Sequence, residues 1–181
     1  MQPMLLTLLD GTTVFIRPIA PEDKPLLSAG LRSLSPETAM RRFLTPKVKF
    51  SAAELRYLTE VDQHDHIAIV AVDARHGGLI GVARCVRVAP DTAELAIVIG
   101  DPWQGLGLGR RLVALLAERA AAEGITKLSG TMLAENRAAF RLMRGFGTHL
   151  DRNEISHGVR EVVTRLAVPA RPLAGAGELR G

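Results

Sequence analysis

The part of this sequence with the clearest chemical meaning is a glycine-rich loop that lies between an apolar run and a long amphipathic segment. The sequence QGLGLGRR fills positions 104–111 and places glycines at 105, 107 and 109. Glycines let successive backbone N–H groups approach an anion, because no Cβ stands in the way. A helix that begins in such a loop adds its unpaired N–H groups and the positive end of its dipole. The loop therefore predicts a phosphate site at a helix N-terminus.

Two common phosphate-binding motifs do not fit this loop. A Walker A loop has Lys and then Ser or Thr after its last glycine, whereas Arg110 and Arg111 stand there. A dinucleotide fingerprint follows the first strand of a βαβ unit, whereas this loop follows the third strand of an expected antiparallel meander. A glycine-rich turn without a ligand is the remaining alternative, although three alternating glycines cost backbone entropy that a plain turn does not require.

The elements that must position the loop follow from the pattern of apolar residues and turn formers. We predict strands at 13–19, 66–73, 79–88, 92–99, 126–132 and 159–168, with a weaker strand at 150–155. Helices are predicted within 21–61 and over 107–123 and 136–144. This order gives an α+β fold with a mixed sheet and helices packed on its faces. We expect residues 1–168 to form one domain and residues 169–181 a flexible tail.

Composition limits the class of protein. A chain of 181 residues with 47% hydrophobic and 23% charged residues suits one domain with a real core. The net charge of +4 favours an anionic ligand but is too small and dispersed to predict a nucleic-acid partner. The single Cys85 excludes an internal disulfide and suits a reducing cytoplasm. No apolar run reaches the ~20 residues of a membrane span, so we expect no membrane association.

The sequence QGLGLG at 104–109 resembles motif A, Q/R-x-x-G-x-G/A, of the GNAT superfamily of acetyl-CoA-dependent N-acetyltransferases. The preceding strand AELAIVI, the aromatic Trp103, the long helix after the loop and the helix start ENRAA also fall in the family's order and spacing. The resemblance covers about residues 13–168. It implies a three-layer α/β/α fold around a central mixed, mostly antiparallel sheet, with acetyl-CoA as co-substrate and no metal.

The same resemblance implies where acetyl-CoA binds. The strand 92–99 is expected to splay from the next strand at a bulge, so that its backbone pairs with the pantetheine amides. N–H groups of the loop would hold the pyrophosphate, and Asn136 is both a good helix N-cap and the family's asparagine that contacts the pantetheine arm. The implied cofactor-binding residues are Ile97, Val98, Ile99, Gln104, Gly105, Leu106, Gly107, Leu108, Gly109, Arg110 and Asn136.

Acetyl transfer to an amine needs a base for the amine and a proton for the departing thiolate. Glu94 is the candidate catalytic residue, because the family commonly places a glutamate near the start of this strand; a solvated outward residue is the alternative. Many family members have a tyrosine seven residues after the asparagine, whereas Met143 stands there and Tyr57 is the only tyrosine. The thiolate would then take its proton from water or from the departing ammonium.

Four segments together look like the catalytic domain of bacterial protein lysine acetyltransferases: RPIAPEDKPLLSAGLRSLSPETAMRRF, VDQHDHIAIVAV, WQGLGLG and LAENRAAFRLMR. The resemblance implies an N-acetyltransferase whose acceptor is a protein lysine or, alternatively, a small-molecule amine or amino acid. A non-catalytic acyl-CoA-binding sensor is the alternative from another class. A homodimer stays open.

The acidic and histidine residues at positions 62–66 are the remaining cluster. Asp62, His64, Asp65 and His66 lack the spacing of a metal site on a regular element, so we interpret them as a polar loop.

Overall fold

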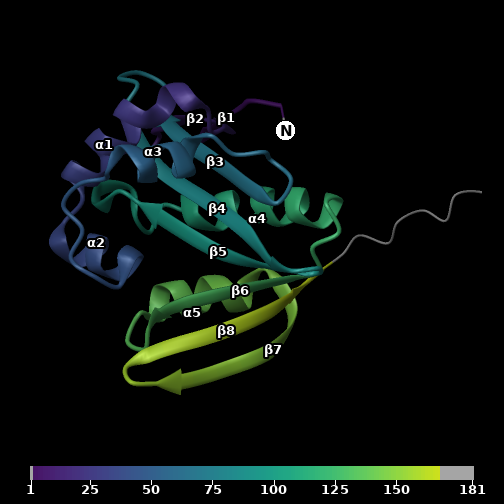
Figure 1. The fold of residues 1–181 in the computed structure, drawn as a ribbon. Helices are drawn as coiled ribbons and strands as arrows, with labels where there is room; N and C mark the ends of the chain where they lie inside the picture. Colours follow the sequence, from purple (N-terminus) through teal and green to yellow (C-terminus); the bar gives the residue numbers. More distant parts are fainter. Residues whose placement is uncertain (1, 168–181) are drawn as a thin grey trace, which may run out of the picture.

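The computed structural model describes residues 2–167, so the tail expected at 169–181 lies outside the described residues. Eight strands form one sheet in the order β1-β2-β3-β4-β5-β6-β8-β7 (Figure 1). In chain order the elements are β1 (Met4–Thr7), β2 (Thr13–Pro18), η1 (Pro21–Asp23), α1 (Lys24–Ser33), α2 (Pro36–Phe43), α3 (Ala52–Thr59), β3 (His66–Asp73), β4 (Leu79–Ala89), β5 (Thr92–Ile99), η2 (Asp101–Trp103), α4 (Leu108–Ala122), β6 (Lys127–Leu133), α5 (Arg137–Gly145), β7 (Gly147–Ser156) and β8 (Val159–Leu166).

All neighbouring strands are antiparallel except β5 and β6, which run parallel. This arrangement confirms the predicted mixed, mostly antiparallel sheet, and β3, β4 and β5 form the expected meander. The edge strand β1 was not predicted. Its four residues, MLLT, alternate between half-buried and exposed side chains, which is the period-two pattern of a strand with one face on the core.

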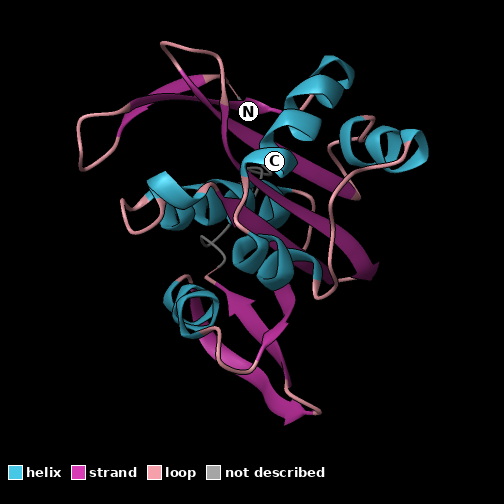
Figure 2. Cartoon of the chain, turned by 90° about the vertical axis from the view of Figure 1, so that its left-hand side faces the viewer, coloured by secondary structure: helices cyan, strands magenta, loops and turns pink. Residues whose placement is uncertain are grey.

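Helices cover both faces of the sheet (Figures 1 and 2). The larger core cluster lies under α4 and α5, where the apolar side chains that recur along α4 are buried. The smaller cluster joins α1 and α3 to the outer faces of β3 and β4. The three-layer α/β/α prediction is therefore confirmed. None of the helices within residues 2–167 is long and apolar enough to cross a membrane.

The helices begin where the sequence supplies a cap. The Ser35 hydroxyl accepts the Thr38 N–H at the start of α2, and Ser51 and Glu54 form a capping box at the start of α3. The Asn136 side chain accepts the Ala139 N–H (3.1 Å), so its predicted role as N-cap of α5 is confirmed.

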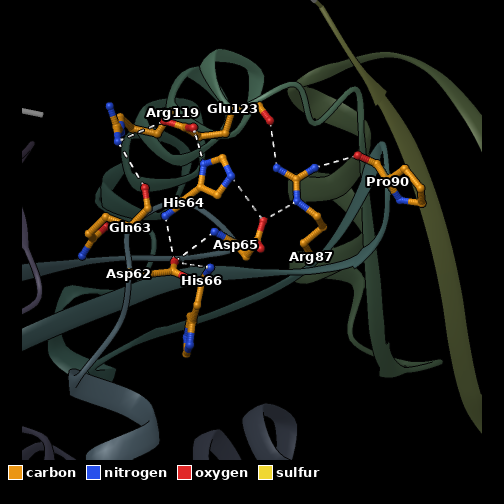
Figure 3. Close-up of polar contacts among 9 residues, drawn as sticks. All are labelled: Asp62, Gln63, His64, Asp65, His66, Arg87, Pro90, Arg119 and Glu123. Atoms are coloured by element: carbon orange, nitrogen blue, oxygen red, sulfur yellow. Dashed lines mark hydrogen bonds and ion pairs between the residues drawn. The ribbon is translucent and has the colours of Figure 1, made fainter.

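The polar loop before β3 ties this end of the sheet to the end of α4 (Figure 3). One carboxylate oxygen of Asp62 accepts the backbone N–H groups of His64, Asp65 and His66, at 2.8, 2.9 and 2.9 Å. Arg87 on β4 donates to Asp65 (2.6 Å) and to the Glu123 carbonyl at the end of α4 (2.8 Å). The cluster noted in the sequence is thus a hydrogen-bonded loop, as interpreted.

Candidate functional site

A pocket of about 540 Å³ opens between β5, β6 and α2, and it contains most of the residues singled out from the sequence. Those that line it are Glu94, Ile97, Val98, Ile99, Gln104, Gly105, Gly107, Gly109, Arg110 and Asn136. Leu106 and Leu108 do not line it, because Leu108 is fully buried and Leu106 packs against the main core. Residues from both ends of the chain segment 94–136 therefore meet at one cavity.

The pocket exists because β5 and β6 separate soon after they meet. They pair over three residue pairs, Thr92–Lys127, Ala93–Leu128 and Glu94–Ser129. Beyond these, β5 stays in register with β4 and β6 stays paired with β8, so each strand presents a free edge to the gap. The expected splay is present, but the expected bulge is not in β5: the irregularity falls between Arg87 and Ala89 of β4.

The glycine loop has the backbone that a phosphate cradle requires. Gly105 and Gly107 have φ of 77° and 87°, in the left-handed region that side chains disfavour. Over residues 2–167, the backbone N–H groups of positions 105–110 have no hydrogen-bond acceptor, whereas the N–H of Arg111 donates to the Gly107 carbonyl (3.3 Å). These free donors surround the N-terminus of α4, where the helix dipole also favours an anion.

A network that the sequence did not indicate joins this loop to α2. Asp101, the first residue of η2, accepts hydrogen bonds from the Ser35 N–H (2.9 Å), the Ser35 hydroxyl (2.7 Å) and the Thr38 hydroxyl (2.7 Å). The Gln104 side chain donates to the same Thr38 hydroxyl (3.1 Å) and to the Ile99 carbonyl (3.0 Å). The backbone N–H of Ser35, followed by these hydroxyls, lowers the pKa of Asp101 below its ordinary value. Asp101 therefore holds α2 against the glycine loop as an ionised carboxylate.

Glu94 is exposed on β5 and lines the pocket together with Thr38, Arg41 and Arg42 of α2. Burial lowers the pKa of the Arg42 guanidinium, and the Glu94 carboxylate acts in the opposite direction. The three α2 residues were not singled out in the sequence. The sequence predicted only that helices lie within 21–61, which does not show what any of these helices faces.

Met143, at the position where many family members have a tyrosine, and Tyr57, the only tyrosine of the sequence, lie in different surroundings. Met143 lines the pocket but is only 3% exposed. Tyr57 is exposed on α3 and does not line the pocket; its ring contacts His66 in a tilted arrangement, with the centroids 4.9 Å apart and the planes at 43°. Among the described residues that line the pocket there is no tyrosine.

Comparison with known proteins gives one family and several related structures. The family described as "Acetyltransferase (GNAT) domain" matches residues 13–149. The chain is 32% identical over 169 residues to "Acetyltransferase Pat" of Mycolicibacterium smegmatis, covering 92% of this chain and 49% of that protein. The chain thus spans about half the length of this curated relative.

Two solved structures share the fold. The GNAT domain of S. lividans PAT superposes with a TM-score of 0.82 at 25% identity, over 91% of this chain and 97% of that chain. The structure of yncA from Salmonella typhimurium with its cofactor acetyl-CoA has a TM-score of 0.67 at 17% identity, over 90% of this chain and 99% of that chain.

Proposed function

Because the chain belongs to the GNAT acetyltransferase family, we propose that it transfers an acetyl group from acetyl-CoA to a primary amine and that this amine is the side chain of a protein lysine. The observation that carries the proposal is the gap between β5 and β6, which runs from an exposed glutamate at one end to a loop of free backbone donors at the other. A donor with an extended amide-bearing arm and a pyrophosphate matches both features.

The cofactor would lie along the free edge of β5. The ladder with β4 turns the backbone groups of Ile97 and Ile99 toward the gap, where they would pair with the pantetheine amides as an added strand does, whereas those of Val98 point toward β4. The N–H groups of residues 105–110, with Arg110 beside them, would hold the pyrophosphate. Asn136, already occupied as a helix cap, lines the pocket on the opposite side and would meet the pantetheine arm. Acetyl-CoA itself supplies the thioester that the amine attacks.

The residues of this chain would then manage protons. Glu94 takes a proton from the acceptor ammonium, directly or through one water, which leaves the amine neutral for attack. A backbone N–H near Ile99 polarises the carbonyl that is attacked. Since Met143 stands where many relatives have tyrosine, the second proton of the amine reaches the leaving thiolate directly or through water.

A thiol-release assay tests the proposal. The purified chain is offered acetyl-CoA with lysine-containing proteins, lysine peptides and small amines, and the acetylated product is identified by mass. We expect turnover on lysine side chains that exceeds turnover on small amines. Tight acetyl-CoA binding without turnover on any acceptor would instead support the sensor alternative, which the buried Met143 favours.

A further inference from the structure

The α2 side of the pocket, where the acceptor amine would enter, contains an arginine that forms no ion pair within residues 2–167. Arg42 on α2 lines the pocket with Glu94, and its guanidinium carbon lies 4.9 Å from the ring centre of Phe43. Over residues 2–167, no carboxylate oxygen lies within 4.0 Å of the Arg42 nitrogens. Its neighbour Arg41, which lines the same pocket, forms an ion pair with Glu37 at 2.6 Å. The two adjacent arginines therefore differ in whether they form an ion pair within residues 2–167.

A second arginine lies behind the first. Arg84 on β4 is 5% exposed, and its guanidinium donates to the Leu58 carbonyl (3.1 Å) and lies 3.1 Å from His66 Nε2. Burial, and next the charge of Arg84, lower the pKa of His66 to about 4, so the imidazole is neutral at physiological pH. Both partners of Arg84 are thus neutral, and a buried charge without a counter-ion is costly.

The sheet register places these charges together. Arg84 is opposite Ala96 in the β4–β5 ladder, so the two side chains lie on the same face of the sheet. Glu94 precedes Ala96 by two residues on β5, so its side chain lies on that face too. After burial, Arg42 is the main group that lowers the pKa of Arg84, to about 10. Arg42 thus lines the pocket, the buried Arg84 lies behind it without lining the pocket, and Glu94 is the one carboxylate among the described residues that line the pocket.

We propose that Arg42, backed by Arg84, is an anion subsite that selects acceptors with a carboxylate close to the amine. The proposal rests on the proposed function, because it names the acceptor of that site. An acceptor carboxylate would take charge-assisted hydrogen bonds from Arg42 and orient the amine toward Glu94. It would also compensate the positive charge of Arg42, which leaves Glu94 free to accept the proton of the ammonium.

The test compares acceptors that differ in one charge. The first pair consists of lysine peptides with either Asp or Asn beside the lysine. The second pair consists of Nα-acetyl-lysine and its amide. Comparing the two pairs shows whether the site prefers a side-chain carboxylate of a peptide or a free α-carboxylate. For the wild-type protein we expect kcat/KM to be about tenfold higher for the carboxylate member of a pair, the effect of roughly one charge-assisted hydrogen bond. The preference should decline toward ~1 M salt, where charges are screened within about 3 Å.

Variants of the two adjacent arginines make the test specific. Arg42→Gln should reduce the preference to within about twofold, whereas Arg41→Gln, whose native charge is already paired with Glu37, should keep it. Circular dichroism and thermal melting verify that each variant is folded. Equilibrium binding of the same peptides, in the presence of CoA, measures the preference independently of turnover.

Two results would overturn the inference. One is equal binding and turnover of the carboxylate and amide acceptors by the wild-type protein, which would leave the proposed acetyl transfer intact. The other is an Arg42→Gln variant that loses activity equally on both acceptors and has a shifted pH profile. That result would mean that Arg42 acts on the charge of Glu94 and does not bind the acceptor. Absence of turnover on every amine would contradict the proposed function instead. The ratio of the affinities for the carboxylate and amide acceptors would still decide the inference about Arg42.

Discussion

Glu94 combines two properties that a base for amine deprotonation needs: access to solvent and a position in the pocket lining. It lies at the last residue pair that joins β5 to β6, so the gap opens immediately beyond it. An amine that enters from the α2 side and a thioester that lies along β5 would meet beside this carboxylate.

Substitution of Glu94 by Gln removes the proposed base and keeps the size of the side chain. We expect kcat/KM to fall by roughly a hundredfold or more, the contribution of a positioned general base, while acetyl-CoA affinity stays near that of the wild type. Steady-state kinetics with calorimetric titration of acetyl-CoA measures both quantities. Glu161→Gln, on an exposed position of β8, is the matched control. Unchanged turnover in Glu94→Gln would remove Glu94 from the mechanism.

At the scale of elements, the glycine loop requires glycine for its backbone conformation and not for lack of room for a side chain. An ideal Cβ on Gly107 would meet no atom within 4 Å, so the requirement for glycine comes from its φ of 87°. We expect Gly107→Ala to cost about 1 to 2 kcal/mol of stability through left-handed strain and to weaken acetyl-CoA binding, because the strained loop turns its N–H groups away. Thermal melting and calorimetry give the two values.

The hairpin between β3 and β4 offers the control for this variant. Gly77 has a φ of 71° and equally open surroundings, but it lies away from the pocket. Gly77→Ala should lose a similar amount of stability and keep acetyl-CoA affinity. Equal loss of affinity in both variants would mean that the loop does not bind the cofactor.

The network around Asp101 links the pH dependence of stability to α2. The pKa of Asp101 is lower in the folded protein than in the unfolded chain, so its contribution is fully present above the unfolded value, near 3.8, and is lost as the pH falls through the lower folded value. Asp101→Asn should lower the free energy of unfolding at neutral pH by about 1 to 2 kcal/mol. It should also make the free energy of unfolding less dependent on pH in the acid range.

The measurement is denaturant unfolding between pH 7 and pH 3. Asp91→Asn is a suitable comparison, because Asp91 also accepts a threonine hydroxyl (Thr92, 2.9 Å) but lies at the β4–β5 turn. Only Asp101→Asn should also raise the KM for the acceptor, since α2 carries the pocket residue Arg42. A KM that is unchanged in both variants would contradict this role.

At the scale of the molecule, the second half of the chain packs around the junction of α5 and β7. A Cβ on Gly147 would clash with the Thr164 side chain and lie 2.6 Å from the Arg165 carbonyl oxygen on β8. We expect Gly147→Ala to cost about 1 to 3 kcal/mol. Gly145→Ala, two residues away and with nothing within 4 Å, should cost less than 1 kcal/mol. Equal melting temperatures for the two variants would refute this packing.

The sequence predicted what is encoded locally. The strand, loop and helix around positions 92–123 follow from periodicity, alternating glycines and a helix start, and the family expected from QGLGLG is confirmed. Most element boundaries differ by about one residue, as for α4, expected over 107–123 and found at Leu108–Ala122. The strand expected at 150–155 is longer and forms β7 over Gly147–Ser156, and β8 ends at Leu166 instead of 168.

What the sequence could not predict depends on distant partners. The bonds of Asp101 to α2 span 66 and 63 residues, and the burial of Arg84 depends on α3 and β3 together. Nothing in the local pattern of RRF separates Arg42, without an ion pair in the described structure, from Arg41, which has one. The roles of such residues emerge only when the topology brings the segments together.

The early separation of β5 and β6 also bears on the solubility of the fold. A strand edge with free N–H and C=O groups can pair with a strand of another chain, and proteins usually protect such edges. The two edges that face the gap lie inside the sheet, where α2 and α5 restrict access to them. An extended co-substrate on the β5 edge would take the place of a strand there, so the same interaction that binds the acetyl donor would also protect the protein against aggregation.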